Sequence, residues 1–237
     1  MGAVNDVKDE SARLDGWRAP PAPARVTLDG RLCRLEPLAV DHAAALHEAN
    51  TLDAEGRMWD YMAYGPFDDF ASYRAWVAQK STSDDPLFFA IIDRVHDAAV
   101  GVASYLRIDA PNGVIEVGHL AYSPRLQRTP AATEAMYLMM RYAFELGYRR
   151  YEWKCNARNE PSRSAAGRLG FTFEGVFRQH MIVKGRSRDT AWYSVIDGEW
   201  PRVRAGFERW LDAGNFDAAG RQRRTLADCR IRPGDRS

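Results

Sequence analysis

This chain of 237 residues has few cysteines and no long apolar run. Its three cysteines, Cys33, Cys155 and Cys229, are too few and too scattered for a disulfide framework or a zinc site. No apolar stretch approaches the roughly 20 residues that a membrane-spanning helix needs. Residues 1–10 also lack the apolar core of a signal peptide. We therefore expect a cytoplasmic protein with no membrane partner and no metal.

The sequence also lacks an excess of either charge. Its formal net charge is +1, so the overall composition gives no reason to expect a nucleic-acid partner. Hydrophobic residues make up 46% and charged residues 27%, which is ordinary for a globular protein. The length fits one domain with appendages.

Three regions follow from composition. Residues 1–24 are polar and then Pro-rich, and predict a mobile leader. Residues 25–212 carry the apolar periodicity of a single domain. Residues 213–237 form a polar, Arg-rich tail, which we expect to pack weakly or not at all. Contact of this tail with nucleic acid is the alternative, but disorder is the preferred interpretation.

Apolar periodicity predicts an alternation of strands and helices. Strands are expected at residues 31–36, 87–92, 100–108, 114–122, 150–155, 171–183 and 191–196. Helices are expected at residues 41–50, from Asp68 or Asp69 onward, and at 132–146, 160–169 and 199–211. Within the helix at 132–146, Glu134 is expected to face water. Residues 184–189 are the expected tip of the last hairpin. This order predicts an α/β fold with a mixed sheet and one βαβ crossover between residues 114 and 155.

The turn between the strand at 114–122 and the helix at 132–146 is the most informative segment. A strand, a short polar turn and a helix start together point several unpaired backbone N–H groups at one spot. The positive end of the helix dipole adds to the field there, so the spot suits a phosphate. The turn therefore predicts a phosphate-bearing cofactor. Its candidate binding residues are Gln127, Arg128, Thr129, Ala131 and Ala132.

Three pieces of sequence in this order resemble the GCN5-related N-acetyltransferases. Glu116-Val117-Gly118-His119 precedes Gln127-Arg128-Thr129-Pro130-Ala131-Ala132, which is similar to the family's pyrophosphate loop. Ala132-Thr133-Glu134-Ala135 opens the following helix. Asn159-Glu160-Pro161-Ser162 is followed by Leu169-Gly170-Phe171 and Glu174-Gly175. The resemblance covers residues 31–196 and is closest to the Rim-type branch, which includes ribosomal-protein N-terminal acetyltransferases.

This resemblance implies a splayed, mixed sheet of about six to seven strands with helices on both faces. It also implies acetyl-CoA as co-substrate. The pantetheine arm would run along the backbone of residues 118–122, including Leu120 and Tyr122, where the next strand diverges. Asn159 would bond to the pantetheine or to the backbone near it. A helix N-cap would explain this asparagine alone, and the two roles are compatible.

Two residues depart from the family pattern. Pro130 replaces a loop glycine and removes one N–H donor, although proline is well tolerated at the first position of a helix. The amides of Arg128, Thr129, Ala131 and Ala132 and the Arg128 guanidinium could take over the phosphate. Ala166 replaces the tyrosine that protonates the leaving thiolate in many members. Ser162 is the candidate for that role, and an ordinary helix serine is the alternative.

Glu116 is the candidate general base for the amine. Alternation predicts that it shares a face with Gly118, Leu120 and Tyr122. In an otherwise apolar strand, its pKa would rise toward a useful range. A structural carboxylate paired with an arginine or an amide is the alternative. His119, expected on the opposite face, is interpreted as a packing residue, and His180 is a weaker alternative base.

The acceptor wall is expected in the aromatic loop, at Trp59, Tyr61 and Tyr64, although an ordinary core cluster would also explain these residues. The predicted activity is acyl transfer from acetyl-CoA to the primary amine of a small molecule or a protein N-terminus by direct attack. Three alternatives are transfer of another acyl group such as succinyl, a non-catalytic acyl-CoA-binding module, and an unrelated nucleotide-binding protein. A homodimer through the C-terminal hairpin or helix is also compatible with the sequence.

Overall fold

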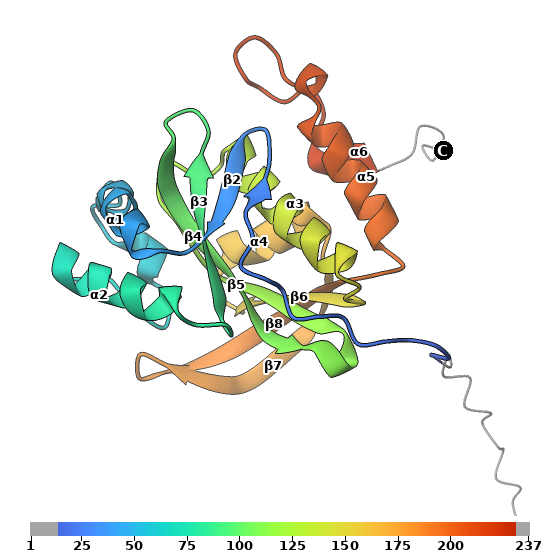
Figure 1. The fold of residues 1–237 in the computed structure, drawn as a ribbon, viewed down its shortest axis with the longest axis horizontal. Helices are drawn as coiled ribbons and strands as arrows, with labels where there is room; N and C mark the ends of the chain where they lie inside the picture. Colours follow the sequence, from blue (N-terminus) through green and yellow to red (C-terminus); the bar gives the residue numbers. More distant parts are fainter. Residues whose placement is uncertain (1–13, 231–237) are drawn as a thin grey trace, which may run out of the picture.

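One sheet of eight strands runs through the computed structural model, which describes residues 14–230 (Figure 1). The spatial order is β1-β2-β3-β4-β5-β6-β8-β7. The strands are β1 (Leu28–Asp29), β2 (Cys33–Pro37), β3 (Leu87–Asp93), β4 (Ala98–Asp109), β5 (Val114–Tyr122), β6 (Arg150–Asn156), β7 (Thr172–Val183) and β8 (Arg186–Ile196). Among the eight strands of the described chain, β5 and β6 alone pair in parallel. The mixed sheet predicted from the sequence is confirmed, with the short β1 as an additional strand.

Helices cover both faces of the sheet, as expected (Figure 1). The helices are α1 (Ala43–Thr51), α2 (Phe70–Ser81), α3 (Pro130–Glu145), α4 (Glu160–Leu169), α5 (Trp200–Leu211) and α6 (Leu226–Arg230). Short 3-10 turns lie at Val40–His42, Arg57–Trp59, Ala110–Asn112 and Ala213–Asn215. One apolar core joins the sheet to α1 and α2, and a larger one joins it to α3, α4, α5 and α6. No helix within residues 14–230 is long and apolar enough to cross a membrane.

Local sequence signals set the helix ends. The Asp69 carboxylate accepts a hydrogen bond from the Ser72 amide at 2.7 Å, so α2 begins after Asp69 rather than Asp68. α3 begins at Pro130, two residues before the expected start, because the Thr129 hydroxyl accepts from the Ala132 amide at 3.1 Å. At the C-terminal end of α4, Gly170 adopts φ +102° and terminates the helix as predicted.

The segments outside the expected domain pack against it, contrary to prediction. Leu226 and Cys229 of α6 are each 1% exposed, so the tail contributes to the core as far as residue 230. The tail is rich in arginine, so its two apolar residues at helical spacing were not recognised as core residues from the sequence. In the leader, Pro20 and Pro23 are buried, and the Ala24 amide donates to the Tyr142 hydroxyl at 3.1 Å. Residues 1–13 of the leader and 231–237 of the tail lie outside the described residues.

Glu134 does not face water. Its carboxylate is buried and accepts hydrogen bonds of 2.6–3.0 Å from the amides of Arg31, Leu32 and Cys33. This contact spans about 100 residues of chain, so helical periodicity could not reveal it. The hairpin tip is also shorter than expected, because Lys184 and Gly185, with φ of 48° and 71°, make a two-residue turn. Residues 186–189 therefore belong to β8.

Candidate active site

β5 separates from β6 half-way along its length. The two strands pair from Val114 opposite Arg150 to Val117 opposite Trp153, and residues 118–122 pair with β4 alone. Backbone groups on that half of β5 therefore line an open sheet edge. This splay is the one that the sequence resemblance implies, and no continuous ladder closes it within the described chain.

A β-bulge at His119 changes which way the side chains of β5 point. At the bulge β5 has one residue more than β4, and His119 adopts φ +52°. Because the extra residue reverses the alternation, Leu120 and Tyr122 pack toward α3. The expectation that they share a face with Glu116 is therefore wrong.

The bulge also places His119 on the same face as Glu116, not on the opposite one. Its ring centroid lies 5.0 Å from that of Phe88, and its Nδ1 lies 3.3 Å from the Tyr64 hydroxyl. Burial lowers the pKa of His119 to about 4, and the charges of Lys80 and Arg107 act in the same direction. The imidazole is therefore neutral at pH 7, in agreement with the packing interpretation.

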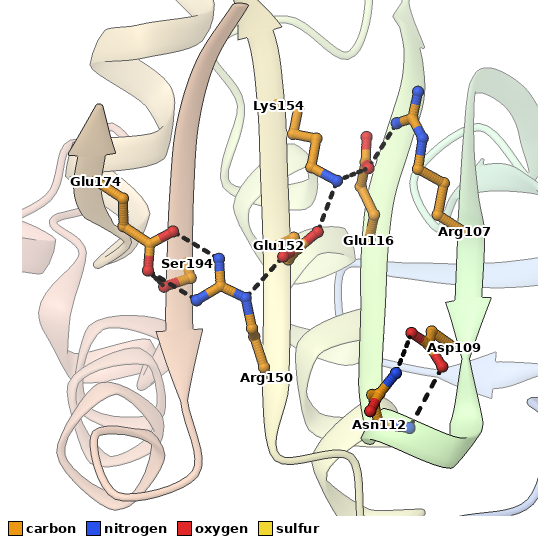
Figure 2. Close-up of polar contacts among 9 residues, drawn as sticks. All are labelled: Arg107, Asp109, Asn112, Glu116, Arg150, Glu152, Lys154, Glu174 and Ser194. Atoms are coloured by element: carbon orange, nitrogen blue, oxygen red, sulfur yellow. Dashed lines mark hydrogen bonds and ion pairs between the residues drawn. The ribbon is translucent and has the colours of Figure 1, made fainter. Parts of the chain in front are cut away.

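A row of charged side chains crosses β4, β5 and β6 at the apex of the splay (Figure 2). Lys154 Nζ lies 2.9 Å from Glu116 Oε2 and 2.7 Å from Glu152 Oε2. Arg107 Nη1 donates to the same Glu116 Oε2 at 2.6 Å. The side chains of Glu116 and Lys154 are only 4% and 6% exposed. The row continues through Arg150, whose Nε lies 2.6 Å from Glu152 Oε1.

The prediction that Glu116 lies among apolar side chains is therefore wrong. The paired alternative matches the geometry, because one carboxylate oxygen contacts two cations. The other oxygen, Oε1, takes part in neither contact (Figure 2) and accepts no hydrogen bond from residues 14–230. A Cβ atom built on Gly118 would lie 3.8 Å from Oε1, so this oxygen faces the residue where the splay begins.

The turn before α3 presents two free backbone amides. Within the described chain, nothing accepts a hydrogen bond from the amides of Arg128 and Ala131. The amides of Gln127, Thr129 and Ala132 are already bonded inside the turn. Two of the four expected phosphate donors are therefore free, and the Thr129 side chain acts as the α3 cap. Gln127 Nε2 donates to the Tyr122 carbonyl at 2.7 Å and so ties the turn to the end of β5.

The start of α4 faces the opposite side of the splay. The Asn159 side chain caps α4 by accepting from the Ser162 amide at 3.1 Å, as in the alternative interpretation, and its Nδ2 has no acceptor in residues 14–230. Ser162 Oγ accepts from Trp153 Nε1 at 3.0 Å, and its hydroxyl can donate in turn, as it does toward the neighbouring Cys155 sulfur. Burial raises the pKa of Cys155, in keeping with an inert thiol.

The aromatic loop divides between core and surface. Trp59 is 5% exposed and belongs to the core formed with α1 and α2, and Tyr64 stacks on His119 with ring centroids 5.6 Å apart. The ordinary core interpretation therefore describes these two residues. Tyr61, which is 39% exposed, is the member of the three that is free to line a site.

Two contacts tie this loop to the facing strands. The Tyr61 hydroxyl donates to the Arg158 carbonyl at 3.1 Å. Lys184 Nζ, at the tip of the β7–β8 hairpin, donates to the carbonyls of Trp59 and Gly65 at 3.0 and 2.6 Å. The loop and the hairpin therefore enclose one side of the site.

A pocket of about 780 Å³ opens where β6 ends. Its wall includes Asn156, Arg158, Phe177, Arg178, His180 and Asp189. β7 has two extra residues here relative to β8, which bends the strand outward. His180 Nδ1 lies 3.0 Å from the Thr190 hydroxyl, so the weaker base candidate lines this pocket rather than the splay.

Sequence reasoning missed Lys154 and Arg107. A signal for Lys154 was present, since Arg150, Glu152 and Lys154 alternate in charge along one face of β6, and Glu116 lies opposite on β5. Among residues 14–230 no group of three or more His, Cys, Asp or Glu side chains could hold a metal ion.

Comparison with known proteins identifies this architecture. Residues 32–172 match the model of the acetyltransferase (GNAT) domain. A GCN5-related N-acetyltransferase from Brucella melitensis is 47% identical, with a TM-score of 0.90 over 92% of this chain and 99% of its own. The uncharacterized N-acetyltransferase p20 of Bacillus licheniformis is 28% identical over 144 residues, which are 59% of this chain and 80% of that protein. A ribosomal L7/L12 α-N-protein acetyltransferase shares the fold, with 20% identity and a TM-score of 0.63 over 72% of this chain and 94% of its own.

Proposed function

The chain belongs to the GNAT acetyltransferase family, and on that premise we propose that it transfers the acetyl group of acetyl-CoA directly to a primary amine. The observation that carries the proposal is the open half of β5 beside two free amides at the start of α3. Acetyl-CoA, when bound, supplies a thioester that an amine can attack. An open strand edge suits its peptide-like arm, and a helix N-terminus suits its diphosphate.

Several residues would hold the co-substrate. The amides of Arg128 and Ala131 and the Arg128 guanidinium would bind the diphosphate. Backbone groups of Leu120 and Tyr122 and the free Nδ2 of Asn159 would bind the pantetheine arm. Gln127 would act by positioning the turn rather than by direct contact.

Glu116 and Ser162 would move the protons. The C–N bond forms as the C–S bond breaks, so the amine loses a proton and the thiolate gains one. Glu116 Oε1 would accept the amine proton, directly or through water, while Arg107 and Lys154 hold the other oxygen in place. Ser162 would donate to the thiolate, because its oxygen is already engaged by Trp153. Tyr61 would line the acceptor side.

The finer choices remain alternatives to be tested. A larger acyl group such as succinyl, or acyl-CoA binding without turnover, would use the same cleft. The acceptor would be a small amine or a protein N-terminus, in the cytoplasm. The outer strand β7 exposes the apolar side chains of Phe173, Val176, Phe177 and Ile182, which would suit a homodimer.

A thiol-release assay over small amines and N-terminal peptides, with acetyl-, propionyl- and succinyl-CoA, tests the proposal. We expect turnover with acetyl-CoA, and we expect Glu116→Gln to lose turnover most strongly at the lower pH values, where the amine most needs a base. Coenzyme binding by calorimetry without thiol release from any amine would favour the non-catalytic alternative. An unchanged pH–rate profile in Glu116→Gln would remove Glu116 from the proton path.

A further inference from the structure

The half-buried guanidinium of Arg188 on β8 has no hydrogen-bond or ion-pair partner within residues 14–230. Its Nε is buried and makes no hydrogen bond, and no carboxylate in residues 14–230 forms an ion pair with it. Arginine stays charged in proteins, and burying a charge without a partner is costly. A buried donor that is unsatisfied in a native site therefore needs a hydrogen-bond acceptor, and residues 14–230 do not supply one.

The register of the sheet places Arg188 at the mouth of the splay, which is the open end of the gap between β5 and β6. The last residue of β6, Asn156, pairs with Thr190, so Arg188 lies two residues beyond the end of β6. It shares a face with Thr190 and Trp192, and the Trp192 ring covers Lys154 Nζ at 3.8 Å. Burial lowers the pKa of Arg188, and the negative charge of Glu116 acts in the opposite direction.

Glu116 forms no ion pair with Arg188 within residues 14–230. The ion-paired row is balanced in charge, because its three cations face three carboxylates: Arg107, Lys154 and Arg150 against Glu116, Glu152 and Glu174. Arg188 is a further cation on the same face of the sheet. The mouth of the splay therefore carries an excess of positive charge, which a ligand anion would neutralise.

The pocket beside Arg188 has the same character. Ser187 and Asp189, its neighbours in the chain, line the pocket together with Arg158 and Arg178. Neither of those two guanidiniums pairs with a carboxylate within the described ranges. The Asp189 carboxylate is already partly occupied, because it accepts a hydrogen bond from the Gln179 amide at 2.7 Å. The volume of about 780 Å³ is typical of a small-molecule site.

We propose that the acceptor is a small primary amine that carries an anionic group, a carboxylate or a phosphate, and that Arg188 binds this group. Arg158 and Arg178 line the neighbouring pocket, whose wall includes Ser187 and Asp189 on either side of Arg188, and attract the anion. The enclosing contacts from Tyr61 to Arg158 and from Lys184 to the aromatic loop favour a small ligand over a polypeptide. This inference rests on the proposed transferase function, because it names that reaction's acceptor.

Matched amines test the inference by binding and by turnover. Calorimetry on the CoA-loaded protein would compare phosphoethanolamine with ethanolamine, β-alanine with propylamine, and amino acids with their amides. Thiol release from acetyl-CoA would be measured on the same pairs. We expect the preferred anionic amine to bind about 10–100-fold more tightly than its neutral partner, the range for a charge-assisted contact. Arg188→Gln should abolish that preference and leave the acetyl-CoA affinity unchanged.

Arg186→Gln is the matched control, because Arg186 lies on the same strand but is exposed, two residues farther from the end of β6 than Arg188. It should keep the preference. The inference is overturned if no anionic amine is preferred, if the preference survives Arg188→Gln, or if acidic N-terminal peptides are the preferred acceptors. It is also overturned if Arg188 instead governs succinyl-CoA against propionyl-CoA with neutral amines. Selective binding without thiol release would support the inference while rejecting the transferase proposal.

Discussion

The two halves of β5 differ in what holds them. Residues 114–117 pair with β4 on one side and β6 on the other, and Ile115 and Val117 are buried in the larger core. Residues 118–122 pair with β4 alone. The change occurs at Gly118 and the bulge at His119. The end of the pairing with β6 and the bulge against β4 therefore coincide, and β5 continues beyond them as an open edge.

The two halves also treat charge differently. Below the bulge, the buried Glu116 carboxylate contacts two cations and joins three strands through a row of ion pairs. At the bulge, His119 is held neutral by burial among aromatic rings. The lower half gains rigidity from charge, and the upper half leaves backbone groups available. Each substitution below acts on one half and leaves the other intact.

Lys154→Met should give the largest effect, and it acts on the lower half. Removing the cation leaves Glu116 and Glu152 facing each other with one partner less, and breaking a buried ion pair costs about 3–5 kcal/mol. Urea unfolding followed by fluorescence would measure the loss. Arg125→Gln is the control, because its ion pair with Glu48 is exposed, and should cost below about 1 kcal/mol. Equal losses in the two variants would show that the buried row is not what joins β5 to β6.

The fold was predictable from the sequence because its signals are local. Asn159 and Gly170 bound α4 at the expected residues, since a cap and a left-handed glycine act within one turn. The separation of β5 from β6 was predicted from the family resemblance. Glu134 was placed wrongly because its partners lie about 100 residues earlier in the chain.

The site was less predictable because it depends on register. Strict alternation put Leu120 and Tyr122 beside Glu116, and a single bulge residue reversed that arrangement. The expected environment of Glu116 failed for a related reason. Neither Arg107 nor Lys154 is near it in sequence, and only the pairing of β4, β5 and β6 brings them together. Arg188 was predicted as part of an exposed tip, but it lies inside β8.

Ser162→Ala tests the open half and should have the next largest effect. If Ser162 protonates the leaving thiolate, its removal should lower kcat about 100–1000-fold, within the range for general acid catalysis. The affinity for acetyl-CoA, measured by calorimetry, should stay the same. Ser164→Ala, on the exposed side of the same helix, is the control and should keep full activity. A kcat within about threefold of the parent would leave Ser162 as an ordinary helix serine.

His119→Asn tests the bulge itself and should have the smallest effect, visible only in acid. The pKa of His119 is lowered to about 4, so the unfolded chain binds a proton that the folded protein refuses. Stability from this group is therefore present above pH 6.5 and lost as the pH falls toward 4. Asparagine tolerates a positive φ but does not titrate. Between pH 7 and pH 4.5 the free energy of unfolding should therefore fall by about 2–3 kcal/mol less in the variant than in the parent. Urea unfolding at both pH values would measure this difference. Tyr64→Phe keeps the imidazole and should retain the acid sensitivity of the parent, whereas equal losses in His119→Asn and the parent would mean that the bulge histidine is protonated in the folded state.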